Sequence, residues 1–135
     1  MTETPLATVE VETSANPLRS IIWLHGLGAD GHDFEPAVPY LVKPGAPAMR
    51  FVFPHAPVRP VTLNGGLPMR AWYDIAALQR RAAQDEAGIR RADVAIRALI
   101  RREIDEFVAK PEMRKDRPAP PPAPPGRPIG EGAAD

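Results

Sequence analysis

The residues best suited to chemistry gather in one short stretch. The apolar run Ile21-Ile22-Trp23-Leu24 leads directly into His25-Gly26-Leu27-Gly28-Ala29-Asp30-Gly31, a loop with three glycines. In a parallel α/β sheet, such a loop presents backbone N–H groups at the carboxyl end of a strand. Those N–H groups can hold a phosphate or a developing oxyanion, and which of the two they hold decides the function.

Candidates for a nucleophile are scarce. The chain has no cysteine and only two serines, Ser14 and Ser20, both of which precede the glycine loop. Its three histidines are His25, His32 and His55.

The loop formally matches G-x-G-x-x-G, which indicates dinucleotide binding only in the right context. That context is a helix opening on the last glycine and an acidic residue at the end of the next strand. Here the next apolar run, residues 50–53, ends in Pro54-His55, and the following helix is delayed and interrupted by prolines. We therefore expect no nucleotide site and no organic cofactor.

A metal site is a further alternative. The residue types are suitable in a set of five: His25, Asp30, His32, Asp33 and His55. Their spacing matches no metal motif, and polar residues in a strand–helix loop usually hydrogen-bond the loop itself. We expect no metal.

Alternating strands and helices must position this loop. At residues 8–13, Val9 and Val11 alternate with Glu10 and Glu12, which predicts a half-exposed strand. The other expected elements are a more fully buried strand at 20–24, a weak helix at 34–42, a third strand at 50–53, a long loop at 54–84 with a turn at 64–66, and a helix at 85–108. The sequence therefore predicts about three strands and two helices in all. The third strand is expected to leave an unpaired edge.

The helix at 85–108 has the clearest pattern. Its apolar residues recur at helical spacing and form one stripe: Ile89, Ala92, Ile96, Leu99, Ile100, Ile104 and Phe107. Its arginines are interpreted as a solvated face. With a net charge of zero, the chain has no basic character that would favour nucleic acid.

Proline divides the chain. Eight of its 18 prolines lie from Pro111 onward, which predicts a partial α/β domain at 1–110 and a disordered proline-rich tail at 111–135. No apolar run approaches the roughly 20 residues that a membrane helix needs. The polar N-terminus and the absence of cysteine favour a cytoplasmic location.

Three blocks of the sequence resemble the phospholipase/carboxylesterase family of α/β-hydrolases, which includes acyl-protein thioesterases and small bacterial carboxylesterases. The first is residues 21–31. The second is Phe53-Pro54-His55-Ala56-Pro57-Val58-Arg59-Pro60-Val61-Thr62-Leu63-Asn64-Gly65-Gly66, which continues to Ala71-Trp72-Tyr73-Asp74-Ile75. The third is Asp85-Glu86-Ala87-Gly88-Ile89. The resemblance covers about residues 7 to 105, roughly the first half of a complete family member.

This resemblance implies roles for a few residues. The backbone N–H of Leu27 would be one oxyanion-hole donor. His25 and Gly26 correspond to a His-Gly pair that shapes the substrate-binding loop, and Trp72 would line the acyl pocket or simply pack in the core. Arg59 and Asp74 would organise the second block through local hydrogen bonds or an ion pair. The substrate would be a small-molecule ester or acyl-thioester.

The catalytic residues of the family come later than the matching blocks. A buried strand should follow the long helix and lead into a G-x-S-x-G elbow, followed by the Asp and His of the triad. None of these motifs is present in the sequence. The chain is therefore interpreted as a truncated serine esterase, inactive by itself, whose reading frame changes near the end of the helix or whose product is naturally short.

A second function class stays open. A proline-rich segment can dock in an aromatic groove, so the chain could be a non-enzymatic interaction product, with an unknown partner for the tail.

Overall fold

The computed structural model describes residues 4–79 and 82–111. Its strands are β1 (Thr8–Glu12), β2 (Ser20–Ile22), β3 (Arg50–Pro54), β4 (Val58–Pro60) and β5 (Pro68–Arg70). Its helices are the 3-10 turns η1 (Glu35–Ala37) and η2 (Thr62–Asn64) and the α-helices α1 (Val38–Leu41) and α2 (Glu86–Ala109). The predicted proline-rich tail lies, from residue 112 onward, outside the described residues.

Three strands form one mixed sheet in the order β1-β3-β2. β1 pairs antiparallel with β3, whereas β2 runs parallel to it, with Ile21 opposite Phe51. The expectation that the third strand leaves an unpaired edge is wrong, because β3 is the central strand and β2 lies at the edge. A parallel pair requires a crossover connection, and the segment that carries η1 and α1 supplies it.

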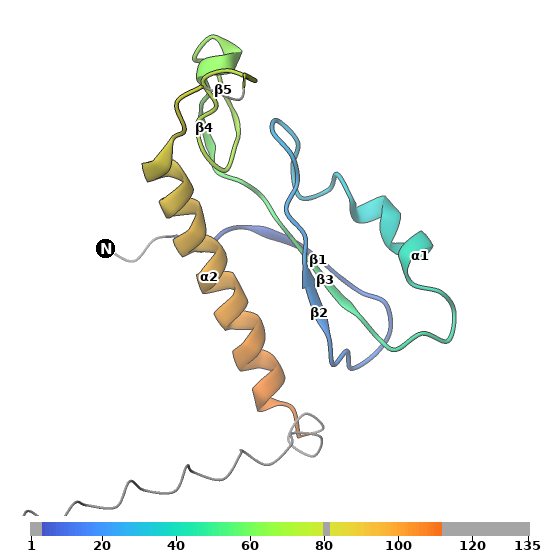
Figure 1. The fold of residues 1–135 in the computed structure, drawn as a ribbon. Helices are drawn as coiled ribbons and strands as arrows, with labels where there is room; N and C mark the ends of the chain where they lie inside the picture. Colours follow the sequence, from blue (N-terminus) through green and yellow to red (C-terminus); the bar gives the residue numbers. More distant parts are fainter. Residues whose placement is uncertain (1–3, 80–81, 112–135) are drawn as a thin grey trace, which may run out of the picture.

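The two faces of this sheet differ in chemistry. In Figure 1, α1 lies on one side of the sheet and α2 on the other. The face toward α1 is apolar, since Phe51 and Phe53 form a core cluster with Val38, against which Val9 and Val11 pack. The predicted helix at 34–42 is present only as η1 followed by the four residues of α1, because Pro36 and Pro39 interrupt the hydrogen-bond ladder.

The face toward α2 contains a partly buried ionic cluster. The Arg50 side chain is 11% exposed, and its Nε lies 2.8 Å from Oε1 of Glu103, which is 5% exposed. Glu10 and Glu12 reach the same guanidinium from β1, at 3.1 and 3.2 Å. Burial alone would lower the pKa of Arg50, but the hydrogen bond and charge of Glu103 raise it above its ordinary value. The acidic side of β1, expected to be half-exposed, thus faces a helix.

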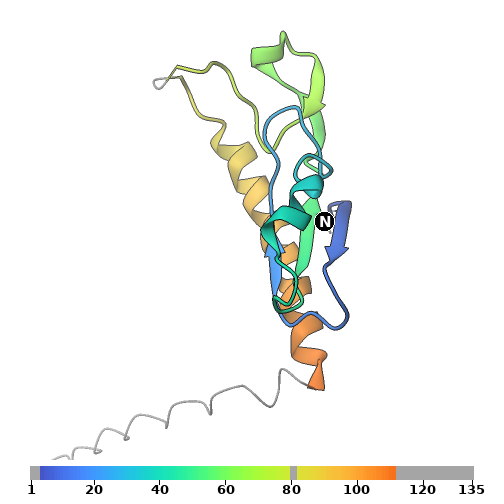
Figure 2. The ribbon, with the colours of Figure 1, turned by 90° about the vertical axis from the view of Figure 1, so that its right-hand side faces the viewer.

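Helix α2 runs along the sheet in both views (Figures 1 and 2). Asp85 caps its N-terminus by accepting a hydrogen bond from Gly88 N at 3.0 Å. Leu99 and Phe107 are buried, but Ile100 and Ile104 are 43% and 46% exposed. The sheet therefore covers only part of the predicted apolar stripe.

The edge strand β2 is less buried than its sequence indicates. Ile21 is 37% exposed and Leu24, just beyond the strand, is 42% exposed. A run of apolar residues predicts burial on both faces and both edges, but no strand among the described residues pairs with the outer edge of β2.

The segment predicted as one long loop contains a hairpin. β4 and β5 pair antiparallel, with Arg59 opposite Met69, and the expected turn at residues 64–66 connects them after η2. The sequence pattern did not predict these strands because they contain Pro60 and Pro68. Proline argues against a strand unless the strand is short and lies at the periphery of the fold, and both conditions hold for β4 and β5. The hairpin lies beyond the carboxyl end of β3 (Figures 1 and 2). None of the helices described is long and apolar enough to cross a bilayer.

Candidate functional site

The loop after β2 presents a free backbone donor at the carboxyl end of the parallel strands. Gly28 N donates to Arg70 O at 2.9 Å, and Ala29 N donates to Gly26 O at 3.2 Å. The N–H of Leu27 donates to no partner within the described residues. Gly28 has φ +76, a left-handed conformation that favours glycine. The turn thus leaves the Leu27 N–H free to bind a ligand oxygen.

His25 fixes the beginning of this loop. Its ring is buried, and Nε2 accepts a hydrogen bond from Ala56 N at 2.9 Å. The remaining proton is therefore on Nδ1, which donates to Gly26 O at 2.7 Å. Because both ring nitrogens are occupied by backbone groups, His25 positions the loop and is not placed as a free acid or base. Its role in substrate binding stays a prediction.

His55 fixes the other end of the loop. Its Nδ1 accepts a hydrogen bond from Gly31 N at 3.0 Å, so the neutral ring carries its proton on Nε2. Gly31 must be glycine, because an added Cβ would lie 2.5 Å from Phe53 O. Burial, together with the positive charge of Arg70, lowers the pKa of His55. The neutral ring that accepts the Gly31 N–H is the favoured form.

Trp72 and Arg70 hold His25 and the glycine loop in place. Trp72 Nε1 donates to His25 O at 2.9 Å, and the two rings lie 5.3 Å apart between centroids. Arg70 Nη1 donates to Ala56 O at 2.7 Å, while the backbone carbonyl of Arg70 accepts from Gly28 N. Sequence reasoning missed Arg70; its only signal was its position directly before Ala71-Trp72.

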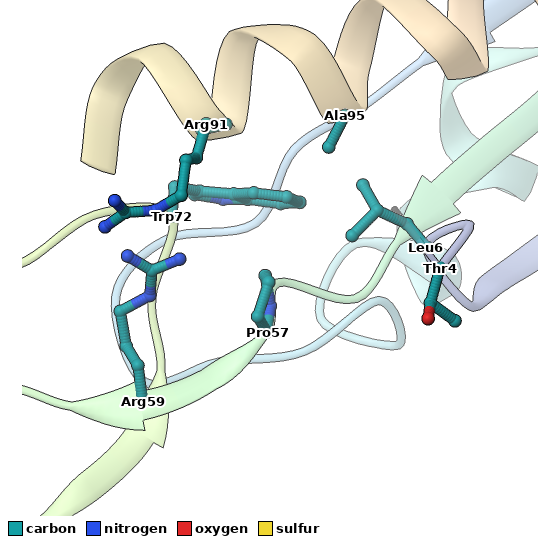
Figure 3. Close-up of a pocket in the computed structure, with 8 residues that line it drawn as sticks. Thr4, Leu6, Pro57, Arg59, Trp72, Arg91 and Ala95 are labelled. Carbon is teal, nitrogen blue, oxygen red and sulfur yellow. The ribbon is translucent and has the colours of Figure 1, made fainter. Parts of the chain in front are cut away.

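Trp72 also lines a cavity of about 140 Å³ between β4, α2 and the N-terminal segment. Figure 3 shows its ring beside the side chains of Arg59 and Arg91, with Leu6 toward the other end. Leu27 is not among the residues that line this cavity. The predicted role of Trp72 in an acyl pocket stays a prediction, since the ring both packs on His25 and faces this cavity.

Asp74 organises the hairpin as expected, but Arg59 does not pair with it. Asp74 accepts hydrogen bonds from Thr62 N at 2.8 Å and Thr62 Oγ1 at 2.6 Å, and these bonds lower its pKa. Arg59 Nε is buried and has no hydrogen-bond partner within the described residues.

The geometry of the glycine loop supports neither a nucleotide site nor a metal site among the described residues. The helical turn η1 begins at Glu35 and not at Gly31, so no helix N-terminus opens on the last glycine. Asp30 accepts a bond from His32 N, and His32 pairs with Glu35 at 2.7 Å. Within the described ranges, no group of three His, Cys, Asp or Glu residues could hold a metal ion.

Neither serine is placed as a nucleophile at this loop. Ser20 lies at the start of β2, opposite the end that leads to Leu27, and its hydroxyl donates to Glu103 at 3.1 Å. Ser14 is an exposed residue between β1 and β2.

Comparison with known proteins identifies the relatives of this arrangement. Residues 6–113 match the family model described as Phospholipase/Carboxylesterase. The chain is 37% identical over 99 residues to acyl-protein thioesterase 1 of Mycosarcoma maydis, covering 72% of the chain and 41% of that relative. It is 37% identical over 104 residues to acyl-protein thioesterase 1 of Neurospora crassa, covering 73% and 42%.

A solved structure of another acyl-protein thioesterase is similar to this chain in fold as well as in sequence. The crystal structure of Zea mays acyl-protein thioesterase 2 superposes with a TM-score of 0.59 at 33% identity, covering 69% of this chain and 39% of that one. The chain thus spans less than half the length of the relatives it matches.

Proposed function

The chain belongs to the phospholipase/carboxylesterase family of α/β-hydrolases, and we propose that its residues supply the oxyanion-binding half of a site that hydrolyses carboxylic esters or thioesters. The observation that carries this proposal is the free N–H of Leu27 in a loop fixed at both ends. A donor that is already positioned before the reaction stabilises the negative charge that develops on a carbonyl oxygen.

In the proposed reaction, a serine hydroxyl attacks the acyl carbonyl carbon while a histidine takes its proton. The carbonyl oxygen becomes an oxyanion, which accepts hydrogen bonds from Leu27 N–H and from the N–H of the residue after the serine. Collapse expels the alcohol or thiol, which receives the proton from the histidine, and water then releases the acid from the acyl-serine. The outer edge of β2, which no strand among the described residues pairs with, offers a place for the strand that would bring this serine beside Leu27.

The 135 residues alone contain no G-x-S-x-G motif, and we propose that they do not turn over substrate. The purified chain should hydrolyse aryl esters and acyl thioesters at the rate of a buffer blank. A rate above the blank that an active-site phosphonate abolishes would refute this and direct attention to Ser20 or to Thr62 as the nucleophile.

A chimera tests the oxyanion role itself. In this chimera, the C-terminal half of the Mycosarcoma maydis relative follows residue 109, and we expect ester and thioester hydrolysis. Leu27→Pro removes one N–H and should lower kcat by a factor of about 10² to 10³, the usual effect of losing one oxyanion donor. Leu27→Ala keeps the N–H and is the matched control, with kcat expected to stay near that of the parent chimera. Equal losses in both variants would show that the side chain, and not the N–H, matters.

A further inference from the structure

The cavity beside Trp72 has an electrostatic feature that the proposed hydrolase does not use. Two arginines from separate elements enter it, Arg59 from β4 and Arg91 from α2. Figure 3 shows both guanidinium groups turned toward Trp72 at the same end of the cavity. Neither arginine forms a salt bridge within the described part of the chain, and Arg59 Nε is buried without a hydrogen-bond partner. Two like charges placed together in this way favour an anion between them.

The nearby carboxylate does not neutralise this pair through a direct contact. Asp85 accepts Gly88 N on Oδ1 at 3.0 Å and Asp74 N on Oδ2 at 2.9 Å. These backbone hydrogen bonds, followed by the charges of Arg91 and Arg59, lower the pKa of Asp85. Both oxygens of Asp85 are therefore engaged in capping α2 and in fixing the segment after Trp72, which leaves the guanidinium donors available to a ligand.

The rest of the cavity is mostly apolar. Leu6 and Ala95 line the end away from the arginines and Pro57 lies between the two ends, and Thr4 beside Leu6 is the one further polar residue among the described residues that line the cavity. Its volume of about 140 Å³ corresponds to roughly four or five water molecules at ~30 Å³ each. A ligand that fills such a space carries one compact anionic group and a short hydrocarbon chain.

We propose that this cavity binds a short-chain carboxylate, with the carboxylate held by Arg59 and Arg91 and the alkyl chain lying against Leu6 and Ala95. The planar guanidinium groups suit a carboxylate, because each guanidinium can hold both carboxylate oxygens through a pair of N–H donors. Inorganic phosphate shares the anionic chemistry but would leave the apolar end empty. The site is separate from Leu27 and does not rest on the proposed hydrolase activity.

The test is a titration of the full 135-residue chain with butanoate at constant ionic strength, followed through the NMR signal of the Trp72 indole N–H. That group is hydrogen-bonded to His25 O and lies at the cavity wall. We expect a saturable shift with butanoate, a weaker response to inorganic phosphate, and none to 1-butanol. Butanoate should also raise the midpoint of thermal unfolding, because a ligand that binds only the folded state stabilises it.

Variants separate this site from general charge effects. Arg59→Gln and Arg91→Gln should each weaken butanoate binding at least tenfold. Arg90→Gln and Arg97→Gln are matched controls, since these helix arginines pair with Glu86 and Asp93, and binding should be unchanged. If the NMR spectrum of the Arg59→Gln variant is no longer dispersed, that variant does not fold and Arg59→Lys replaces it. Arg59→Lys keeps the charge without the planar fork of N–H donors and should still bind butanoate more weakly than the parent chain. A non-saturating shift, an equal response to 1-butanol, tighter binding of phosphate, or unchanged binding in the Arg59 and Arg91 variants would overturn the proposal.

Discussion

Glu103 is expected to be the residue on which the docking of α2 most depends. It comes from the C-terminal half of the long helix α2, yet its side chain is only 5% exposed and lies against Arg50 on the central strand. Its Oε1 also accepts a hydrogen bond from Ser20 Oγ on the edge strand at 3.1 Å. One carboxylate thus joins α2 to two strands, on the sheet face that also buries Val52 and, from α2, Leu99 and Phe107.

The substitution Glu103→Gln should lower the free energy of unfolding by about 3 kcal/mol. Removing one partner of a buried ion pair costs about 3–5 kcal/mol, because the other charge is left without compensation. Arg50 would retain its ion pairs with Glu10 and Glu12, so the cost of losing the Glu103 charge lies at or below the lower limit of that range. The weakened hydrogen bond from Ser20 adds up to about 1 kcal/mol to this cost. Glu86→Gln is the matched control, since its pair with Arg90 is about 75% exposed and such pairs are worth about 0–1 kcal/mol.

The measurement is urea unfolding followed by far-ultraviolet circular dichroism at a fixed concentration of trimethylamine oxide, which favours the compact state. The Glu103 variant should unfold at a clearly lower urea concentration with an unchanged slope. A loss similar to that of the Glu86 control, or a gain in stability, would refute the view that this ion pair docks the helix.

Three further outcomes are expected. Since burial lowers the pKa of His55 below its ordinary value of 6.5, its contribution to stability should be complete above that pH and decline as pH falls below it; a lower protection of the Gly31 amide at pH 5 than at pH 7.5, measured as its exchange rate relative to the intrinsic rate at each pH, would show this, and His55→Gln should flatten the difference. Gly88→Ala should bring no net gain in stability although alanine favours helices by about 1 kcal/mol, because a Cβ there would displace the capping Asp85 carboxylate and the loss of a cap costs about as much; increased helix content by circular dichroism would contradict this. The isolated chain should be only marginally stable, because α2 and β2 expose apolar residues; a sharp calorimetric transition of a monomer would be evidence against it.

The site could be predicted from the sequence only in part. The glycine loop after an apolar run placed Leu27 at the carboxyl end of a strand, and the structure leaves its N–H free. The neutral tautomers of His25 and His55 could not be predicted, because their backbone partners lie 31 and 24 residues away along the chain. Arg91 was interpreted as part of a solvated helix face and it is exposed, but its place beside the cavity at Trp72 could not be predicted, because helical spacing does not reveal which neighbouring element lies opposite a side chain.

By itself, the sequence determined the elements whose signals are local. The alternation of Val9 and Val11 with Glu10 and Glu12 predicted β1, and the spacing of Leu99 and Phe107 predicted α2 and its buried side. These patterns are local because each follows from the geometry of one strand or one helix. The blocks around the glycine loop and Trp72 likewise sufficed to identify the family.

Only the tertiary structure decided how these elements are ordered and what each face meets. It placed β3 at the centre and β2 at an exposed edge, although both are apolar runs with the same local pattern. It also brought Arg50 and Glu103, 53 residues apart along the chain, into a part-buried ion pair. The physical reason is that strand order and ion pairing depend on contacts between residues distant in sequence, whereas periodicity reports only the shape of a single element.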